Sequence, residues 1–118
     1  MKWLDKDPDE IDYRDIDWTL RLYNEAERIA YEAAVALNPA LELTPLLAVV
    51  PADTLQSSTF TLPPPLTAGP ASTFTQQATR VWFSASGVAG ETYDVLNRVT
   101  TALGRSLDQT VKLKIKIK

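Results

Sequence analysis

The sequence of 118 residues contains neither cysteine nor histidine. Without cysteine, the chain has no disulfide framework, no thiolate zinc site and no thiol nucleophile. Without histidine, it lacks the commonest general base and metal ligand, and with them the Ser-His and Cys-His dyads. Catalysis would have to rest on carboxylates, Lys, Tyr or Ser/Thr alone, and no second motif positions such groups. We therefore expect a protein that is not an enzyme and uses no cofactor.

Basic charge and long apolar runs are also scarce. Twelve Lys and Arg residues stand against 15 Asp and Glu residues, which gives a net charge of −3. Nucleic-acid binding needs a basic face that neutralises phosphates. The longest apolar stretch, 46–51, is too short to span a bilayer, and the acidic start of the chain lacks the apolar region of a signal peptide. We therefore expect no nucleic-acid partner and no membrane segment.

The last third of the chain carries the clearest structural pattern. After Thr110, apolar and basic residues alternate strictly: Val111, Leu113, Ile115 and Ile117 against Lys112, Lys114, Lys116 and Lys118. Successive side chains of a strand point to opposite faces, so this run predicts one dry face and one charged face. Residues 74–84 and 93–100 also have strand patterns, and Gly104 suits the hairpin before the last strand. These runs predict an antiparallel sheet with one face on a core.

The first two thirds mix further strands with one helix. Residues 16–22 alternate as a half-buried strand, and 56–62 form a strand that ends at three prolines. The proline run either terminates this strand or is a ligand for aromatic-lined grooves. Between the two strands, Asn24 is a good N-cap for a helix that extends to Leu37 and packs by a stripe of apolar residues. The apolar run 46–50 favours a short buried strand.

Two residues of the strand at 93–100 bear on the fold type. Tyr93, near the strand start, is typical of the corner of an immunoglobulin-like sandwich, although a plain strand aromatic explains it equally well. Asn97 lies on the core side, so its amide must be hydrogen-bonded. We predict a mainly β fold, a small antiparallel β-sandwich of immunoglobulin-like type with one inserted α-helix. Residues 1–15 would form an acidic N-terminal arm and 16–118 the sandwich domain, with the helical insertion at about 23–52.

The predicted arm combines six carboxylates with two large apolar side chains at its start. Clustered acids can bind a hard cation, but these lack the later Gly and Glu of a calcium loop, and a solvated acidic arm is the alternative. The arm of one copy could lie on the lysine-edged strand of the next copy in a ring; alternatively, the lysines protect an exposed strand edge. The candidate interface comprises Trp3, Leu4, Asp5, Asp7, Asp9, Lys112, Lys114 and Lys116.

Several stretches occur in a recognisable order along the chain. They are KWLDKDPDE with the later Tyr13 and Asp17-Trp18, then DTLQSSTFTLP, and finally VWFS, GETY, NRVTT, GRS and DQTVKL. In this order they resemble a small family of tailed-bacteriophage virion proteins described as fibre–tail adaptors. The resemblance covers residues 1–22 and 53–118, so that 23–52 would be an insertion. It implies a compact β-sandwich that acts as a structural connector without catalysis.

From this resemblance we expect a virion protein that connects tail or neck components to fibres or to each other. Its partners would be other phage virion proteins, with a ring-type oligomer in a particle assembled in the host cytoplasm. The alternative is a carbohydrate- or protein-binding sandwich with exposed Trp3, Trp82 or Phe83 as its platform. Residues 81–83 lie within a strand, so at least one of the last two aromatics should belong to the core.

Overall fold

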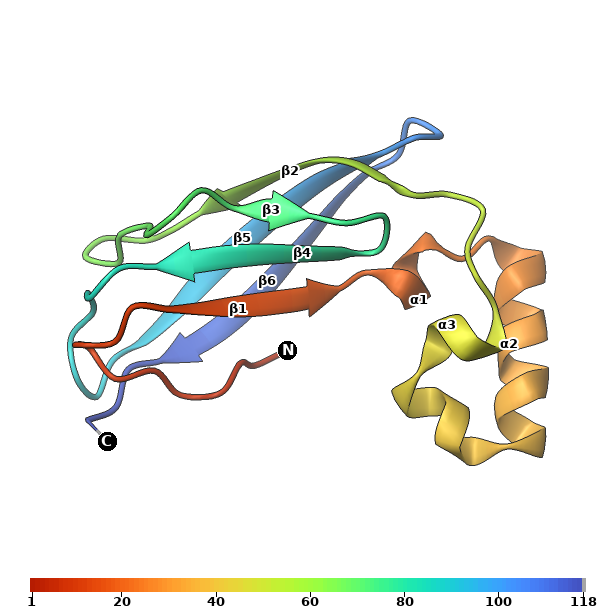
Figure 1. Cartoon of the computed structure of the whole chain (residues 1–118), viewed down its shortest axis with the longest axis horizontal. Helices are drawn as coiled ribbons and strands as arrows, with labels where there is room; N and C mark the ends of the chain where they lie inside the picture. The colour runs from red at the N-terminus through yellow and green to blue at the C-terminus, as the bar shows by residue number, and fades with distance from the viewer. Residues whose placement is uncertain (118) are drawn as a thin grey trace.

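The computed structural model describes residues 1–117 and consists mainly of β-strands (Figure 1). Within that range, two three-stranded antiparallel sheets have the strand orders β1-β4-β3 and β2-β5-β6. The strands are β1 (Asp12–Asp17), β2 (Leu55–Thr61), β3 (Thr73–Phe74), β4 (Ala78–Phe83), β5 (Thr92–Thr101) and β6 (Ser106–Lys114). The predicted mainly β fold is thus confirmed, together with strands near 56–62 and 93–100. Lys118, which we placed on the charged face, lies outside the described residues.

The core lies between the two sheets, where alternate residues of each strand point inward. In β6 the predicted dry face is confirmed as far as Ile115, whereas Ile117 lies beyond the strand and is 71 % exposed. Gly104 has a φ of +89°, as the hairpin between β5 and β6 requires. The buried cluster draws on both sheets and consists of Trp3, Ile16, Trp18, Leu22, Leu55, Leu66, Val81, Phe83, Val95, Val99, Val111, Leu113 and Ile115.

One buried amide joins the two sheets through a polar network. The Oδ1 atom of Asn97 accepts hydrogen bonds from Trp18 Nε1 at 3.1 Å and from Thr79 Oγ1 at 2.7 Å. Its Nδ2 atom donates to Ser58 Oγ and to the Thr59 carbonyl, both at 2.9 Å. An asparagine amide offers two donors and two acceptor positions, so its hydrogen-bonding capacity is fully used. The prediction that Asn97 faces the core and is hydrogen-bonded is confirmed.

The first strand begins and ends earlier than predicted. β1 stops at Asp17, and Thr19–Leu22 form the short helix α1 instead of continuing the strand. The Asp17 carboxylate accepts hydrogen bonds from the Thr19 amide at 2.9 Å and the Thr19 hydroxyl at 2.6 Å, which turns the chain at this point. The prediction of a strand over 16–22 is therefore wrong beyond Asp17.

The predicted strand at 74–84 is a short hairpin. β3 and β4 pair antiparallel, with Thr73 opposite Arg80 and Phe74 opposite Thr79. A turn separates them, in which the Thr75 amide donates to the Ala78 carbonyl at 2.8 Å. The strand-like composition of this stretch therefore conceals a chain reversal.

The helices lie together at one end of the molecule, beside the sheets (Figure 1). They are α2 (Glu25–Leu37), the 3-10 helix η1 (Pro39–Leu43) and α3 (Pro45–Ala48), and we call residues 24–52 the helical lobe. The predicted cap is confirmed, because Asn24 and Glu27 bond reciprocally in a capping box. The predicted strand at 46–50 is wrong: Pro45 occupies the first helical turn, where proline is favoured, and its carbonyl accepts from the Val49 amide at 3.0 Å.

Candidate interaction surfaces

The start of the predicted acidic arm lies along β6 of its own chain, and the end of the arm is part of β1. Residues 1–6, which we call the N-terminal segment, form parallel bridges between Lys2 and Lys112 and between Lys6 and Ile115. The Trp3 amide donates to the Lys112 carbonyl at 3.0 Å. The backbone of β6 is therefore paired on its outer side over this stretch.

Trp3 fixes this segment to the core. Its side chain is only 8 % exposed and meets Phe83 edge to face at 6.0 Å between ring centroids. Its Nε1 atom donates to the Asp15 carbonyl in β1 at 2.8 Å, and Arg14 of β1 donates to the Leu4 carbonyl at 3.2 Å. The segment thus bridges β6 and β1 and closes one side of the sandwich. Leu4 itself is 84 % exposed.

The remaining arm residues form a turn around a buried lysine. The Lys6 Nζ atom donates to the Asp7 carbonyl at 2.9 Å, and burial lowers the pKa of its ammonium group although Glu10 opposes this change. The Asp9 amide donates to the Asp7 carboxylate at 2.8 Å, and the Asp7 amide to Glu10 at 2.8 Å. Among the described residues, no group of three acidic side chains is placed to hold a metal ion. No pattern in the sequence indicates that Lys6 is buried.

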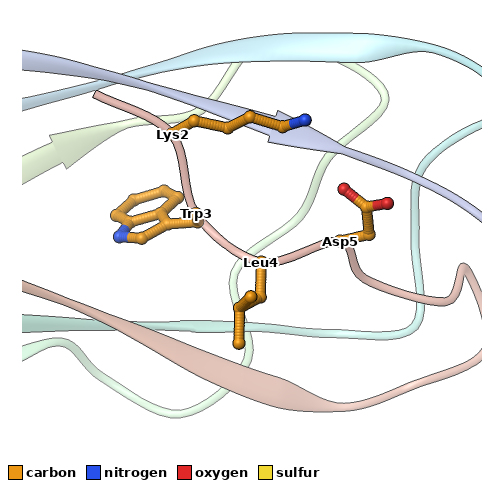
Figure 2. Close-up of a pocket in the computed structure, with 4 residues that line it drawn as sticks. All are labelled: Lys2, Trp3, Leu4 and Asp5. Atoms are coloured by element: carbon orange, nitrogen blue, oxygen red, sulfur yellow. The ribbon is translucent and has the colours of Figure 1, made fainter.

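The lysines of the last strand differ in their surroundings. Lys112 is exposed and forms an ion pair with Asp94 at 2.9 Å, whereas Lys114 is half-buried and Lys116 is exposed. Beside them is an open hollow of about 580 Å³ lined by Lys2, Trp3, Leu4 and Asp5. Figure 2 shows that Lys2 and Leu4 point in different directions from this stretch of chain. We call the surface formed by Lys2, Leu4, Lys112, Lys116 and Ile117 the basic edge.

The helical lobe has a large apolar surface of its own. Helix α2, which lies wholly within the described residues, buries none of its side chains. The predicted packing stripe is therefore wrong as a contact within this chain: η1 and α3 cover only the side of α2 that includes Tyr31 and Ala34. The opposite side is exposed and carries Ala26, Ile29, Ala30, Ala33 and Leu37. These residues recur at the i, i+3, i+4 spacing of one helical face.

An ion pair attaches the lobe to the sheets. Arg105, in the turn of the β5–β6 hairpin, donates to Asp53 Oδ2 at 2.9 Å and to the Leu22 carbonyl at 2.7 Å. Burial raises the pKa of Asp53, but hydrogen bonds from Thr101, Leu103 and Arg105 outweigh it and hold the pKa below its ordinary value. The pair thus links the ends of the lobe to the hairpin.

Most of the aromatic residues that the alternative function would use to bind a ligand are buried. Trp3 and Phe83 are buried in the core, which confirms that one of the two strand aromatics is internal. Trp82 is half-buried and contacts Tyr13 at 5.0 Å between ring centroids, while the Arg80 guanidinium lies 3.9 Å from the Tyr13 ring. The outer face of the β1–β4 pair therefore carries one compact aromatic group.

Comparison with known proteins identifies the family of this chain. Among the described residues, no helix is both long and apolar enough to cross a membrane. No curated protein matches the chain. Residues 32–114, more than two thirds of the chain, match the family described as podophage GP4 fiber-tail adaptor protein gp77. The match begins within α2, so it includes residues 32–52 of the predicted insertion. The chain belongs to this family of podophage fibre-tail adaptor proteins, as its ordered motifs indicated.

Proposed function

We propose that this chain is a structural virion protein of a tailed bacteriophage that connects tail or neck components to fibres or to each other. Family membership supports the class of function. The observation that carries the proposal is the exposed apolar side of α2, on a molecule whose core lies elsewhere, between the sheets. Contiguous exposed apolar surface marks sites of protein contact.

The contact residues predicted from the sequence belong to this proposal, with one change of role. Leu4, Lys112 and Lys116 are exposed and available to a partner. Trp3 lies in the core, so it would position the neighbouring surface and not touch a partner. The proposed interface also includes Lys114 and three acidic residues, Asp5, Asp7 and Asp9. We propose that copies assemble through such surfaces into a ring-type oligomer in the virion, after synthesis in the host cytoplasm.

We also propose an immunoglobulin-like relationship for the sandwich and its division at about residue 15. Two antiparallel sheets around one core support the first part. The Tyr93 hydroxyl accepts a hydrogen bond at 3.1 Å from the Val88 amide, five residues upstream, in the manner of a tyrosine corner. A connector of this kind needs no catalytic group and no cofactor.

The direct test uses the phage itself and purified components. Deleting the coding sequence from the phage genome should give particles whose tails lack fibres in electron micrographs. The purified chain should bind recombinant tail or fibre proteins in a pull-down, and Leu4→Asp combined with Leu47→Asp should weaken that binding. Phe74→Asp is the control, because Phe74 is an exposed apolar residue of β3 that belongs to neither surface. Fully fibred particles from the deletion phage would refute the proposal.

The alternative function, a carbohydrate- or protein-binding sandwich, rests on Trp82 and Tyr13. Their paired rings offer an apolar face with Arg80 beside it, which suits a sugar ring. A glycan array probed with the purified chain separates the two functions. Binding that disappears in Trp82→Ala would favour the alternative, and an array without signal would discard it.

A further inference from the structure

We propose that the helical lobe of one copy binds the basic edge of a second copy, in a head-to-tail contact. This inference rests on the proposed assembly role, to which it adds the two surfaces that meet and the identity of the partner. Four observations on the molecule support it: an unpaired apolar helix face, the charge of the lobe, the chemistry of the basic edge and the positions of the two surfaces.

The rest of the lobe also exposes large aliphatic side chains, as the free side of α2 does. Ile29 and Leu37 are exposed on the helix, at 59 % and 91 %. Leu43 in η1, Leu47 in α3 and Val50 just after α3 are exposed as well, so each helix of the lobe presents large aliphatic groups to solvent. An amphipathic helix with this pattern fits against a surface that offers apolar groups at matching spacing.

The charge of the lobe selects the partner. The lobe holds four carboxylates, Glu25, Glu27, Glu32 and Glu42, against the single cation Arg28, which gives −3. This equals the net charge of the whole chain, so the remainder of the sequence is balanced. Two lobes would repel each other, and a symmetric lobe-to-lobe dimer is therefore disfavoured. The partner surface needs aliphatic groups bordered by cations.

The basic edge has this composition. Leu4 and Ile117 are strongly exposed, and the same edge carries the exposed Lys2, Lys112 and Lys116, with Lys2 paired to Lys112 along the backbone. The hollow of about 580 Å³ beside Leu4 can receive a side chain from a partner (Figure 2). Asp5 also lines the hollow, and Asp94 pairs with Lys112, so the attraction at this surface comes mainly from Lys2 and Lys116.

The positions of the two surfaces make the contact head-to-tail. The molecule is 43 Å long, and the lobe occupies one end while the N-terminal segment runs toward the other (Figure 1). Different surfaces on the two copies form a heterologous contact, which closes into a ring or continues as a filament. The acidic arm proposed from the sequence cannot take the place of the lobe without withdrawing Trp3 from the core of its own chain.

The absence of cysteine from the sequence allows a specific cross-linking test. Ala33→Cys marks the lobe and Leu4→Cys marks the basic edge, and oxidation of a mixture of the two purified chains should give mixed dimers in clear excess over either homodimer. A chain with both substitutions should give a ladder of covalent oligomers. Phe74→Cys replaces either partner as the control, because Phe74 is exposed in β3, outside both surfaces. Equal yields of mixed and control dimers would overturn the inference.

Charge reversal provides the second measurement, by light scattering or sedimentation at low salt. Glu25→Lys with Glu32→Lys should weaken self-association about tenfold, and so should Lys2→Glu with Lys116→Glu. A mixture of the two reversed chains should recover part of the loss. A chain that stays monomeric at high concentration, or variants that associate like the original, would refute the contact. If the same chain still binds tail or fibre proteins, the proposed function stands; if that binding also fails, the proposed function fails with it.

Discussion

Replacing Asn97 by alanine removes an amide that joins both sheets. In the intact chain its oxygen accepts from Trp18 and Thr79, and its nitrogen donates to Ser58 and to the Thr59 carbonyl. Trp18 retains a hydrogen bond to Thr79 Oγ1 at 3.2 Å, but the Thr79 hydroxyl proton loses its acceptor and the Thr59 carbonyl loses the Asn97 donor. The variant therefore leaves polar groups without a hydrogen bond in the core and on its border.

The magnitude follows from those lost bonds. Each buried polar group left without a partner costs about 1–3 kcal/mol. Two such groups give a loss of about 2–6 kcal/mol, which is a large share of the roughly 5–15 kcal/mol that stabilises a domain of this kind. At about 4 °C per kcal/mol, the melting temperature should fall by about 8–24 °C.

The assay is urea unfolding of the full chain, followed by tryptophan fluorescence, with a thermal melt as the second probe. Gln56→Ala is the control, because Gln56 is exposed on the neighbouring strand β2 and its replacement should change the free energy of unfolding by less than about 0.5 kcal/mol. Asn97→Asp should be less stable at pH 7 than at pH 4. A deprotonated carboxylate cannot donate a hydrogen bond to the Thr59 carbonyl, whereas the protonated acid can. A loss below about 1 kcal/mol in Asn97→Ala would refute the reasoning.

Three further predictions concern the segment, the ion pair and the lobe. Trp3→Ala should lower the free energy of unfolding by about 3–5 kcal/mol, because the N-terminal segment loses its contact with the core. Hydrogen exchange of the Lys112 amide should become faster, and unchanged exchange would contradict this prediction. The pKa of Asp53 is lower in the folded chain than its unfolded value near 4, so its stabilisation is present above that unfolded pKa and is lost as the pH falls through the folded pKa. In Asp53→Asn the free energy of unfolding should therefore depend less on pH in the acid range, as measured by circular dichroism. Leu37→Ser should alter the free energy of unfolding by less than about 0.5 kcal/mol, because Leu37 is 91 % exposed. A larger fall in the free energy measured by urea unfolding would mean that the lobe packs on the sheets.

Sequence patterns predicted those elements whose signal is local. The alternation from Val111 to Ile115 places β6 correctly, because a half-buried strand imposes that period on its own residues. The helix start at Asn24 follows from its capping box, which needs only the residues up to Glu27. Asn97 was recognisable as a core residue because its neighbours at even spacing are apolar.

The remaining features depend on contacts between distant parts of the chain. The burial of Trp3 and Lys6 requires β6, more than a hundred residues later. The large apolar side chains of Trp3 and Leu4 indicate that the N-terminus packs somewhere, but they do not show where, and nothing nearby signals the burial of Lys6. The apolar run before Val50 has no periodicity that separates a strand from a single helical turn. For α2, the stripe of apolar residues correctly shows that one face is apolar, but periodicity does not show what covers that face. The interface residues therefore stay predictions until the partners are measured.

The pairing of Lys2 with Lys112 also determines when a newly synthesised chain can finish folding. Residues 1–6 leave the ribosome long before β6 exists, so Trp3 has no pocket during most of synthesis. Contacts between such distant residues form late, because a long loop must close first. A chain interrupted before Ser106 leaves both the indole and the inner faces of the sheets in solvent, where chaperones and proteases recognise it. The N-terminal segment can therefore take its place only on a chain whose synthesis has passed through β6.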